Sequence, residues 1–95
     1  MPQVLYSPRA LIDLEEISDY IGRDNPRRAV SYLEELRAHC AVVAENPLAY
    51  VQRDDIAPGA RMAMHGRYRI LFHSVARGIE IVRIVHGARR LPESM

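Results

Sequence analysis

Two runs of β-branched and aromatic residues near the end of the chain restrict its fold more than any other feature. They cover residues 68–75 and 79–86, and a three-residue loop ending in Gly78 separates them. A loop of this length, with glycine where a left-handed conformation is needed, joins antiparallel strands into a hairpin. The sequence therefore predicts a hairpin in which Val75 faces Ile79.

This register divides the hairpin into two faces, because alternate side chains of a strand point to the same side. One face is predicted to carry Tyr68, Ile70, Phe72, Val82, Ile84 and His86. The other is predicted to carry Arg69, Leu71, His73, Val75, Ile79, Ile81, Arg83 and Val85. Residues 61–65 also alternate, which predicts a third strand before a turn at Gly66. Both faces of the hairpin are partly apolar, and one gathers two arginines and a histidine.

Length and composition indicate one small globular domain covering residues 1–95. The apolar fraction is 48% and the charged fraction 26%, with no repeat or low-complexity run. The net charge of +1 argues against a domain that holds nucleic acid by bulk electrostatics. We therefore expect no direct sequence-specific nucleic-acid binding.

All thirteen cationic side chains are arginine, so the chain has no lysine for catalysis. The single cysteine, Cys40, excludes an internal disulfide and is typical of a reducing compartment. The N-terminus lacks a basic segment followed by a long apolar run, so neither a signal peptide nor a membrane span is expected. Together these features predict a cytoplasmic location.

The first forty-five residues are predicted to form a short strand and two helices. Residues 4–6 precede a helix over 8–23, which Ser7 caps and Pro8 starts. A break at residues 24–26 then begins a second helix that ends near Glu45. The predicted buried stripes are Leu11, Leu14, Ile17 and Ile21 on the first helix, and Ala29, Leu33, Leu36, Cys40 and Val43 on the second.

Several polar residues of this region have no predicted chemical role. The acidic group of Asp13, Glu15, Glu16 and Asp19 is interpreted as a solvated helix face. His39 is expected to be exposed, because neighbouring helical residues point about a quarter turn apart and His39 with Cys40 makes a poor metal site. We assign no metal and no cofactor. The long segment 46–59 is predicted to be either functional or mobile.

The order strand, helix, helix and three strands predicts an α+β domain with a helical hairpin packed on one face of an antiparallel sheet. Two helices cover only one face. The other is then expected to expose apolar side chains, which suggests a covering partner. Those side chains are Leu71, Val75, Ile79, Ile81 and Val85.

The chain resembles the ParE branch of the RelE/ParE toxins of type II toxin–antitoxin systems over nearly its whole length. The order and spacing of several short motifs carry this resemblance. They are Ser7-Pro8-Arg9-Ala10 before Asp13-Leu14-Glu15-Glu16-Ile17, then Asp24-Asn25-Pro26, Ala44-Glu45-Asn46-Pro47, Gly66-Arg67-Tyr68 and Ile81-Val82-Arg83-Ile84-Val85-His86-Gly87-Ala88-Arg89. The resemblance implies the fold predicted above and a ParD-like antitoxin, with toxin and antitoxin forming a hetero-oligomer.

The superfamily has two activities, which differ in the residues they need. RelE-like members cut messenger RNA in the ribosome, a reaction that needs a base, an acid and cations around the phosphate. In RelE-like enzymes these roles belong to lysines, arginines and a tyrosine in the tail. Arg69 and Arg89 match two arginine positions, but the chain has no lysine and no tyrosine after Tyr68. The ParE branch shows the same losses, and its members poison DNA gyrase without being nucleases. We therefore predict a non-catalytic gyrase inhibitor, with a RelE-like ribonuclease as the alternative and a structural adaptor as a third possibility.

The candidate residues follow from the predicted register and the resemblance. The target-binding candidates are Arg69, Arg83, Arg89 and Arg90, and the antitoxin-binding candidates are Leu71, His73, Val75, Ile79, Ile81 and Val85. Arg83 has two interpretations. It either contacts the target or forms a structural ion pair with Glu80 or an antitoxin carboxylate. His86 is interpreted as a structural histidine at the sheet edge. His65, His73 and His86 are the alternatives for replacing the missing catalytic base.

Overall fold

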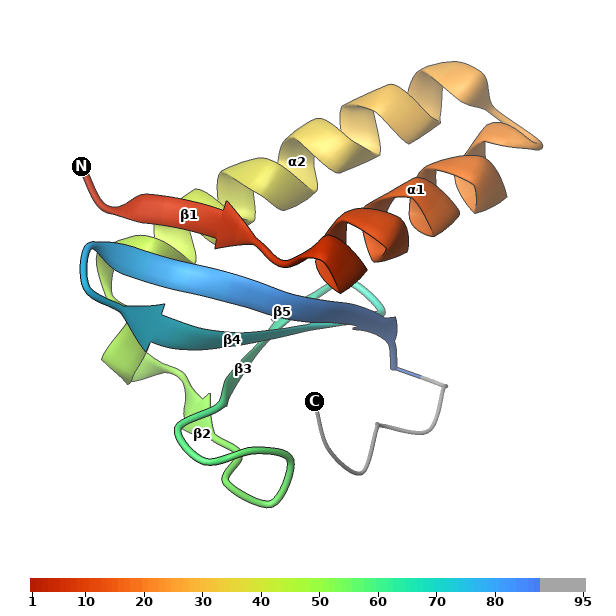
Figure 1. Ribbon diagram of the computed structural model, residues 1–95. Coiled ribbons are helices and arrows are strands. Elements are labelled where there is room, and N and C mark those ends of the chain that lie inside the picture. The colour runs from red at the N-terminus through yellow and green to blue at the C-terminus, as the bar shows by residue number, and fades with distance from the viewer. Residues whose placement is uncertain (88–95) are drawn as a thin grey trace.

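The computed structural model describes residues 1–87, so Arg89 and Arg90 lie outside the described residues. A helical hairpin covers one side of a twisted sheet (Figure 1). The elements in order are β1 (Gln3–Tyr6), α1 (Pro8–Gly22), α2 (Pro26–Glu45), a 3-10 turn η1 (Pro47–Ala49), β2 (Val51–Gln52), β3 (Arg61–His65), β4 (Tyr68–Val75) and β5 (Gly78–His86). The predicted α+β class and helical hairpin are confirmed.

The sheet has five strands in the order β1-β5-β4-β3-β2. Strands β2 to β5 pair antiparallel, but β1 runs parallel to β5, so the sheet is mixed. The prediction of a wholly antiparallel sheet was therefore wrong at β1. A parallel pair needs a long crossover connection, and everything between β1 and β5, the helical hairpin included, supplies it here. The short strand β2 was not predicted.

Both helices begin as their sequences indicate. The Ser7 side chain accepts a hydrogen bond from the Ala10 amide, and Asn25 accepts one from the Arg28 amide. A proline follows each cap at the first helical position, where its missing N–H costs nothing. These local signals set the starts of α1 and α2.

The hydrophobic core lies between the helices and the sheet. It contains Ala10, Leu14, Ile17, Leu36, Cys40, Val43, Ala44, Ala63, Ile70, Phe72, Ile79, Ile81 and Ile84. The predicted stripe of α2 is confirmed, although Leu33 lies at its edge. On α1, Ala10 takes the inward position and Leu11 remains 48% exposed, so including Leu11 in the buried stripe was wrong. This rotation of α1 turns Asp13 inward.

The β4–β5 hairpin differs from the prediction at its turn. Val75 pairs with Gly78 and not with Ile79, so the turn has two residues. The positive-φ glycines of the described chain are Gly59 and Gly66, which shows that Gly78 is not a left-handed turn residue. It is required for another reason: an added Cβ would lie 1.9 Å from the Gln3 carbonyl oxygen on β1.

A β-bulge on β5 then restores the predicted register. Leu71 pairs with Arg83 while Phe72 pairs with Ile81, so Val82 is the extra residue. A bulge shifts alternation by one position. Ile81 and Ile79 therefore face the helices, whereas the hairpin beyond the bulge has the faces that the sequence predicted.

The segment 46–59 is a folded loop. After η1 and β2, the Asp54 carboxylate accepts hydrogen bonds from the Gly59 amide and the Gln52 side chain. The Arg53 amide donates to the Ala60 carbonyl at the loop's base, and Ile56 is buried. These contacts explain how a long connection without a long strand or helix keeps one conformation.

Candidate functional site

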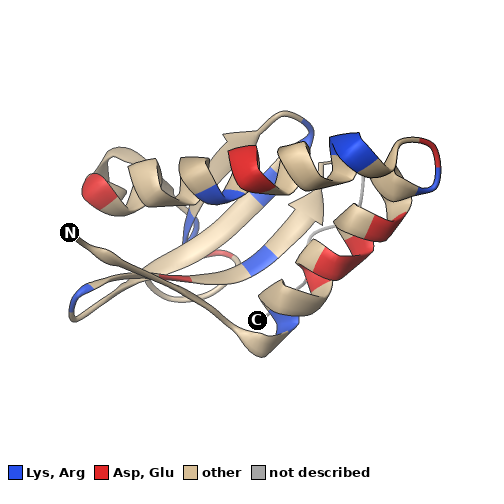
Figure 2. Ribbon diagram, turned by 90° about the horizontal axis from the view of Figure 1, so that it is seen from above, with Lys and Arg blue, Asp and Glu red and all other residues tan. Residues whose placement is uncertain are grey.

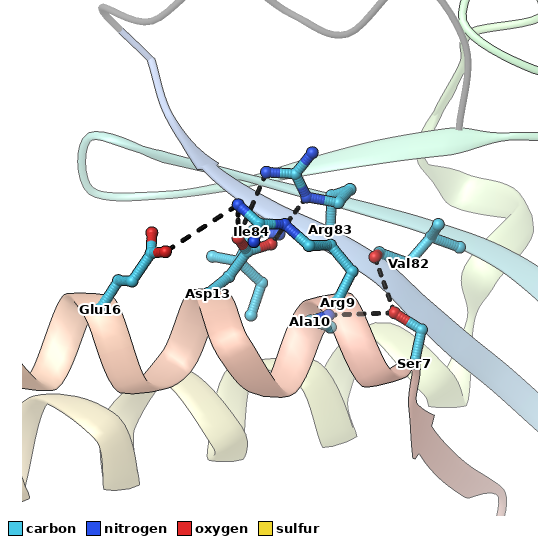
Figure 3. Close-up of polar contacts among 8 residues, drawn as sticks. All are labelled: Ser7, Arg9, Ala10, Asp13, Glu16, Val82, Arg83 and Ile84. Atoms are coloured by element: carbon cyan, nitrogen blue, oxygen red, sulfur yellow. Dashed lines mark hydrogen bonds and ion pairs between the residues drawn. The ribbon is translucent and has the colours of Figure 1, made fainter.

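The start of α1 completes the edge of β5 where β1 ends. Pairing between β1 and β5 stops at Tyr6 and Ile81. The Ser7 amide then donates to the Ile81 carbonyl at 2.9 Å. The Ser7 hydroxyl donates to the Val82 carbonyl at 2.8 Å, a contact drawn in Figure 3. Ser7 therefore caps α1 and also ties it to β5.

Asp13 continues this connection one turn further along α1. Its Oδ2 accepts the Ile84 amide at 2.9 Å, which is a backbone donor that β1 no longer reaches. The same carboxylate accepts two hydrogen bonds from the Arg83 guanidinium, at 2.9 Å from Nε and 3.2 Å from Nη2. Arg9 lies 3.5 Å from Oδ1 of Asp13. Figure 3 shows the Arg9 and Arg83 side chains both directed toward Asp13. Asp13 is only 3% exposed, and these donors offset the cost of burying its carboxylate.

This geometry corrects two predictions. Asp13 does not belong to a solvated acidic face, because it is buried against β5. Arg83 forms a structural ion pair, but with Asp13 and not with Glu80. Glu80 instead lies 2.7 Å from His73 across the β4–β5 pair. No sequence signal marked Asp13 as inward, because its position depends on the rotation of α1.

The predicted arginine patch is only partly assembled by residues 1–87. Arg69 and Arg83 share the sheet face away from the helices, but the Arg83 guanidinium is bound to Asp13. Arg69 donates to the Gly87 carbonyl at 3.4 Å. Arg89 and Arg90 are outside the described residues. Of the target-binding candidates within residues 1–87, Arg69 is therefore the one whose guanidinium is not bound to a buried carboxylate.

The sheet face away from the helices is less openly apolar than predicted. Ile79 and Ile81 are buried in the core and do not lie on this face, so their placement there was wrong. Leu71 and Val85 do lie on it, and both are buried. Of the other predicted antitoxin contacts, Val75 and His73 are half-buried on this face. Sequence reasoning missed Val51 and Met64, which pair in register with residues of this face and are exposed.

A pair of histidines links α2 to β3. The Nδ1 atoms of His39 and His65 lie 2.9 Å apart and the ring centroids 5.1 Å apart, so the rings meet head-on through these nitrogens. One ring must donate its proton to the other. Burial, and then the neighbouring His39, lowers the pKa of His65. His39 is half-buried, so the prediction that it is exposed was wrong.

Two further histidines were considered as replacements for a catalytic base. His86 packs edge-on against Tyr68, with ring centroids 5.3 Å apart. His73 lies at the other end of β4, five residues from the Tyr68–His86 pair. At about 3.3 Å per residue this separates them by roughly 17 Å. The two rings also lie on opposite faces, so they do not form one acid–base pair.

An open pocket of about 580 Å³ lies between α1 and the β3–β4 turn, and we call it the α1 pocket. Ile17, Tyr20 and Ile21 line it from the helix, and Ile84 lines it from β5. Its other walls are formed by Asp13, Glu16, Tyr32, Gly66, Arg67, Tyr68 and His86. Sequence reasoning missed this pocket, because its walls come from five separate elements.

The remaining titratable groups of the core have structural surroundings. Cys40 is buried, and burial raises the pKa of its thiol despite a hydrogen bond with Tyr6. Burial likewise raises the pKa of Tyr6. Within residues 1–87, no group of three or more histidine, cysteine, aspartate or glutamate side chains is placed to hold a metal ion. None of the helices in that range is both long and apolar enough to cross a membrane.

The helical hairpin on a five-stranded mixed sheet defines a class of small α+β domains with solved members. A solved structure described as "Chromosomal ParDE TA system from P. aeruginosa" matches this chain with a TM-score of 0.76 and 19% sequence identity. The match covers 90% of this chain and 96% of that one. A comparison with curated proteins returned no significant match.

The sequence identifies the family within this class. The family model "ParE toxin of type II toxin-antitoxin system, parDE" matches residues 4–91. The chain therefore belongs to the ParE toxin family, as its motifs predicted.

Proposed function

We propose that this toxin inhibits DNA gyrase by binding it, and that a ParD-like antitoxin neutralises it. The match of residues 4–91 to the ParE family carries the proposal. Its composition supports a non-catalytic action, since the chain has no lysine. The described histidines have other partners: His39 and His65 contact each other, His73 contacts Glu80, and His86 packs against Tyr68.

We further propose that the target is contacted through Arg69 and the two tail arginines, Arg89 and Arg90. Arginine is a common anchor at protein interfaces because its planar guanidinium forms several directed hydrogen bonds. Arg83 lies on the same face as Arg69. Its bond to Asp13 means that replacing Arg83 perturbs the fold as well as any target contact.

The antitoxin is proposed to cover the same sheet face. Of the predicted contacts on this face, His73 and Val75 are half-buried, whereas Leu71 and Val85 are buried beneath it. Exposed Val51 and Met64 extend the accessible apolar part of that face. An antitoxin on this face would also cover Arg69. Neutralisation then follows from direct competition for one surface.

The decisive experiment is expression of the toxin without antitoxin, with plasmid supercoiling and messenger RNA integrity followed in the same cells. Loss of negative supercoiling with intact messages is the expected result. Discrete cuts within codons, abolished by His73→Gln or His86→Gln, would instead assign a ribosome-dependent ribonuclease and overturn the proposal. Purified gyrase with purified toxin then tests direct inhibition.

A matched pair of variants tests the surface. Arg69→Ala should weaken gyrase inhibition, whereas Arg77→Ala should not. Arg77 is an exposed arginine in the β4–β5 turn at the opposite end of the hairpin, and its carbonyl, not its side chain, bonds to β1. Equal inhibition by the parent and both variants would remove Arg69 from the target surface.

A further inference from the structure

The α1 pocket has the features of a docking site for one large side chain. Ile17, Ile21 and Ile84 give it an apolar lining. Tyr32 and Tyr68 lie in its wall with ring centroids 6.0 Å apart. At about 580 Å³ the pocket is large enough for a bulky aliphatic or aromatic side chain, and such a concave apolar lining is typical of binding pockets.

Tyr20 is the most unusual member of the lining. It is 68% exposed, although its neighbours Ile17 and Ile21 pack into or against the core. A large aromatic ring held in water gains nothing from folding this chain alone. It does supply contact area at low entropic cost to a partner, which is why tyrosine is enriched at interfaces.

The mouth of the pocket carries charges of both signs on opposite sides. Asp13 is already bound by Arg83 and the Ile84 amide, so Glu16 is the accessible carboxylate of the lining. Its nearest cation, Arg9, is 4.0 Å away, and its side chain is 49% exposed. Glu15 and Asp19 are further exposed carboxylates of α1, whose acidic residues are red in Figure 2. Exposed Arg67 stands on the turn side.

We propose that the α1 pocket receives a bulky apolar side chain of the antitoxin, carried by a segment whose basic residue pairs with Glu16. This rests on the proposed function and adds a contact separate from the sheet face. The arrangement fits an amphipathic helix of the antitoxin. Such a helix would insert one apolar side chain into the pocket, with a basic residue on the α1 side and an acidic residue on the Arg67 side. A rim charge pair contributes register and association rate, while the buried side chain contributes most of the affinity.

The test measures binding of the parent toxin and its variants to the purified product of the adjacent antitoxin gene. Tyr20→Ala and Glu16→Lys should each weaken binding roughly tenfold, the size of a moderate interface hot spot. Glu15→Lys is the matched control, since it makes the same charge change one residue away on an exposed position outside the lining. It should change binding by less than about threefold. The loss in Glu16→Lys should also shrink at high salt.

Each outcome has a distinct meaning. The three altered side chains, Tyr20, Glu16 and the control Glu15, are exposed on α1, so circular dichroism should report an unchanged fold. If Glu16→Lys were misfolded, Glu16→Gln carries the charge test. Antitoxin binding that is equal in the parent, Tyr20→Ala and Glu16→Lys would overturn the pocket proposal while leaving the proposed function intact. No binding by the parent would overturn both. A dimer of the toxin alone that Tyr20→Ala abolishes would assign the pocket to a second copy and also overturn the proposal.

Discussion

Asp13 on α1 accepts two hydrogen bonds from Arg83 on β5, a residue 70 positions further along the chain. The same carboxylate accepts the Ile84 amide, so one side chain satisfies both a guanidinium and the backbone edge of β5. A buried carboxylate without such donors would be strongly unfavourable. The contact therefore fixes the position of α1 against the sheet, and with it the helix wall of the α1 pocket.

Replacing Asp13 should destabilise the protein strongly. Asp13→Ala leaves the Arg83 guanidinium and the Ile84 amide without their acceptor, and losing one partner of a buried ion pair costs about 3–5 kcal/mol. We expect the lower end of this range, because the Arg83 side chain is 21% exposed and partly hydrated. Urea unfolding measures the loss. Glu15→Ala on the exposed side of the same helix should change stability by less than about 0.5 kcal/mol, and an equal loss in both variants would contradict the assignment.

Gly78 should not tolerate a side chain. In Gly78→Ala the new Cβ would lie 1.9 Å from the Gln3 carbonyl oxygen, so β1 must move away from β5. Overpacking of this kind costs about 1–3 kcal/mol, and thermal unfolding should show a lower Tm. Gly22→Ala is the control, since its Cβ would meet only the Ala29 Cβ at 3.7 Å. If Gly78→Ala were as stable as the parent, the close approach of β1 would be wrong.

The sequence predicts the elements better than it predicts their rotation and pairing. Caps at Ser7 and Asn25 are local signals, so both helices were located to within one residue. The alternation of β4 and β5 was also readable, but the bulge at Val82 was not. A bulge leaves no local signature in a strand where β-branched residues occur on both faces, as Ile81, Val82 and Ile84 do here. The prediction therefore placed Ile79 and Ile81 on the wrong face.

The candidate site was predictable only where it depends on residue type. The absence of lysine is a property of composition, and it supports the proposed non-catalytic action without a structure. The bond between Asp13 and Arg83 depends on how far α1 rotates and where β1 ends, which are tertiary properties. The α1 pocket depends on the same two properties. Arginine spacing alone could not show that Arg83 is already paired.

Cys40 should react with alkylating reagents only after unfolding. It is buried in the core, and burial raises the pKa of its thiol, so little reactive thiolate exists at neutral pH. Mass spectrometry after iodoacetamide treatment should show no adduct for the folded toxin and one adduct in concentrated urea. Fast modification of the folded protein would show that the α2–β1 contact, where Tyr6 bonds to Cys40, opens readily.

The His39–His65 pair should make the stability of the toxin depend on pH. The pKa of His65 is lowered, first by burial and then by the charge of His39, whereas the unfolded chain keeps the ordinary value near 6.5. Between the lowered pKa and about 6.5 the unfolded chain binds more protons, so the free energy of unfolding rises with pH through this window. The full stability is present above it and falls as the pH drops toward the folded pKa.

His65→Gln removes this titrating group and should flatten the rise in the free energy of unfolding below about pH 6.5. His39→Gln should flatten it only in part, since it removes the neighbouring charge but leaves the burial of His65. Glu35 raises the pKa of His65 and Arg28 lowers it, so the charges of this ion pair act on His65 in opposite directions. Urea unfolding at several pH values measures the slopes, and an NMR titration of the His65 ring should give a pKa below 6.5. If the free energy of unfolding of His65→Gln changed with pH as steeply as that of the parent, the titration of His65 would not contribute to stability. The 2.9 Å contact between His39 and His65 would then not link α2 to β3 in solution.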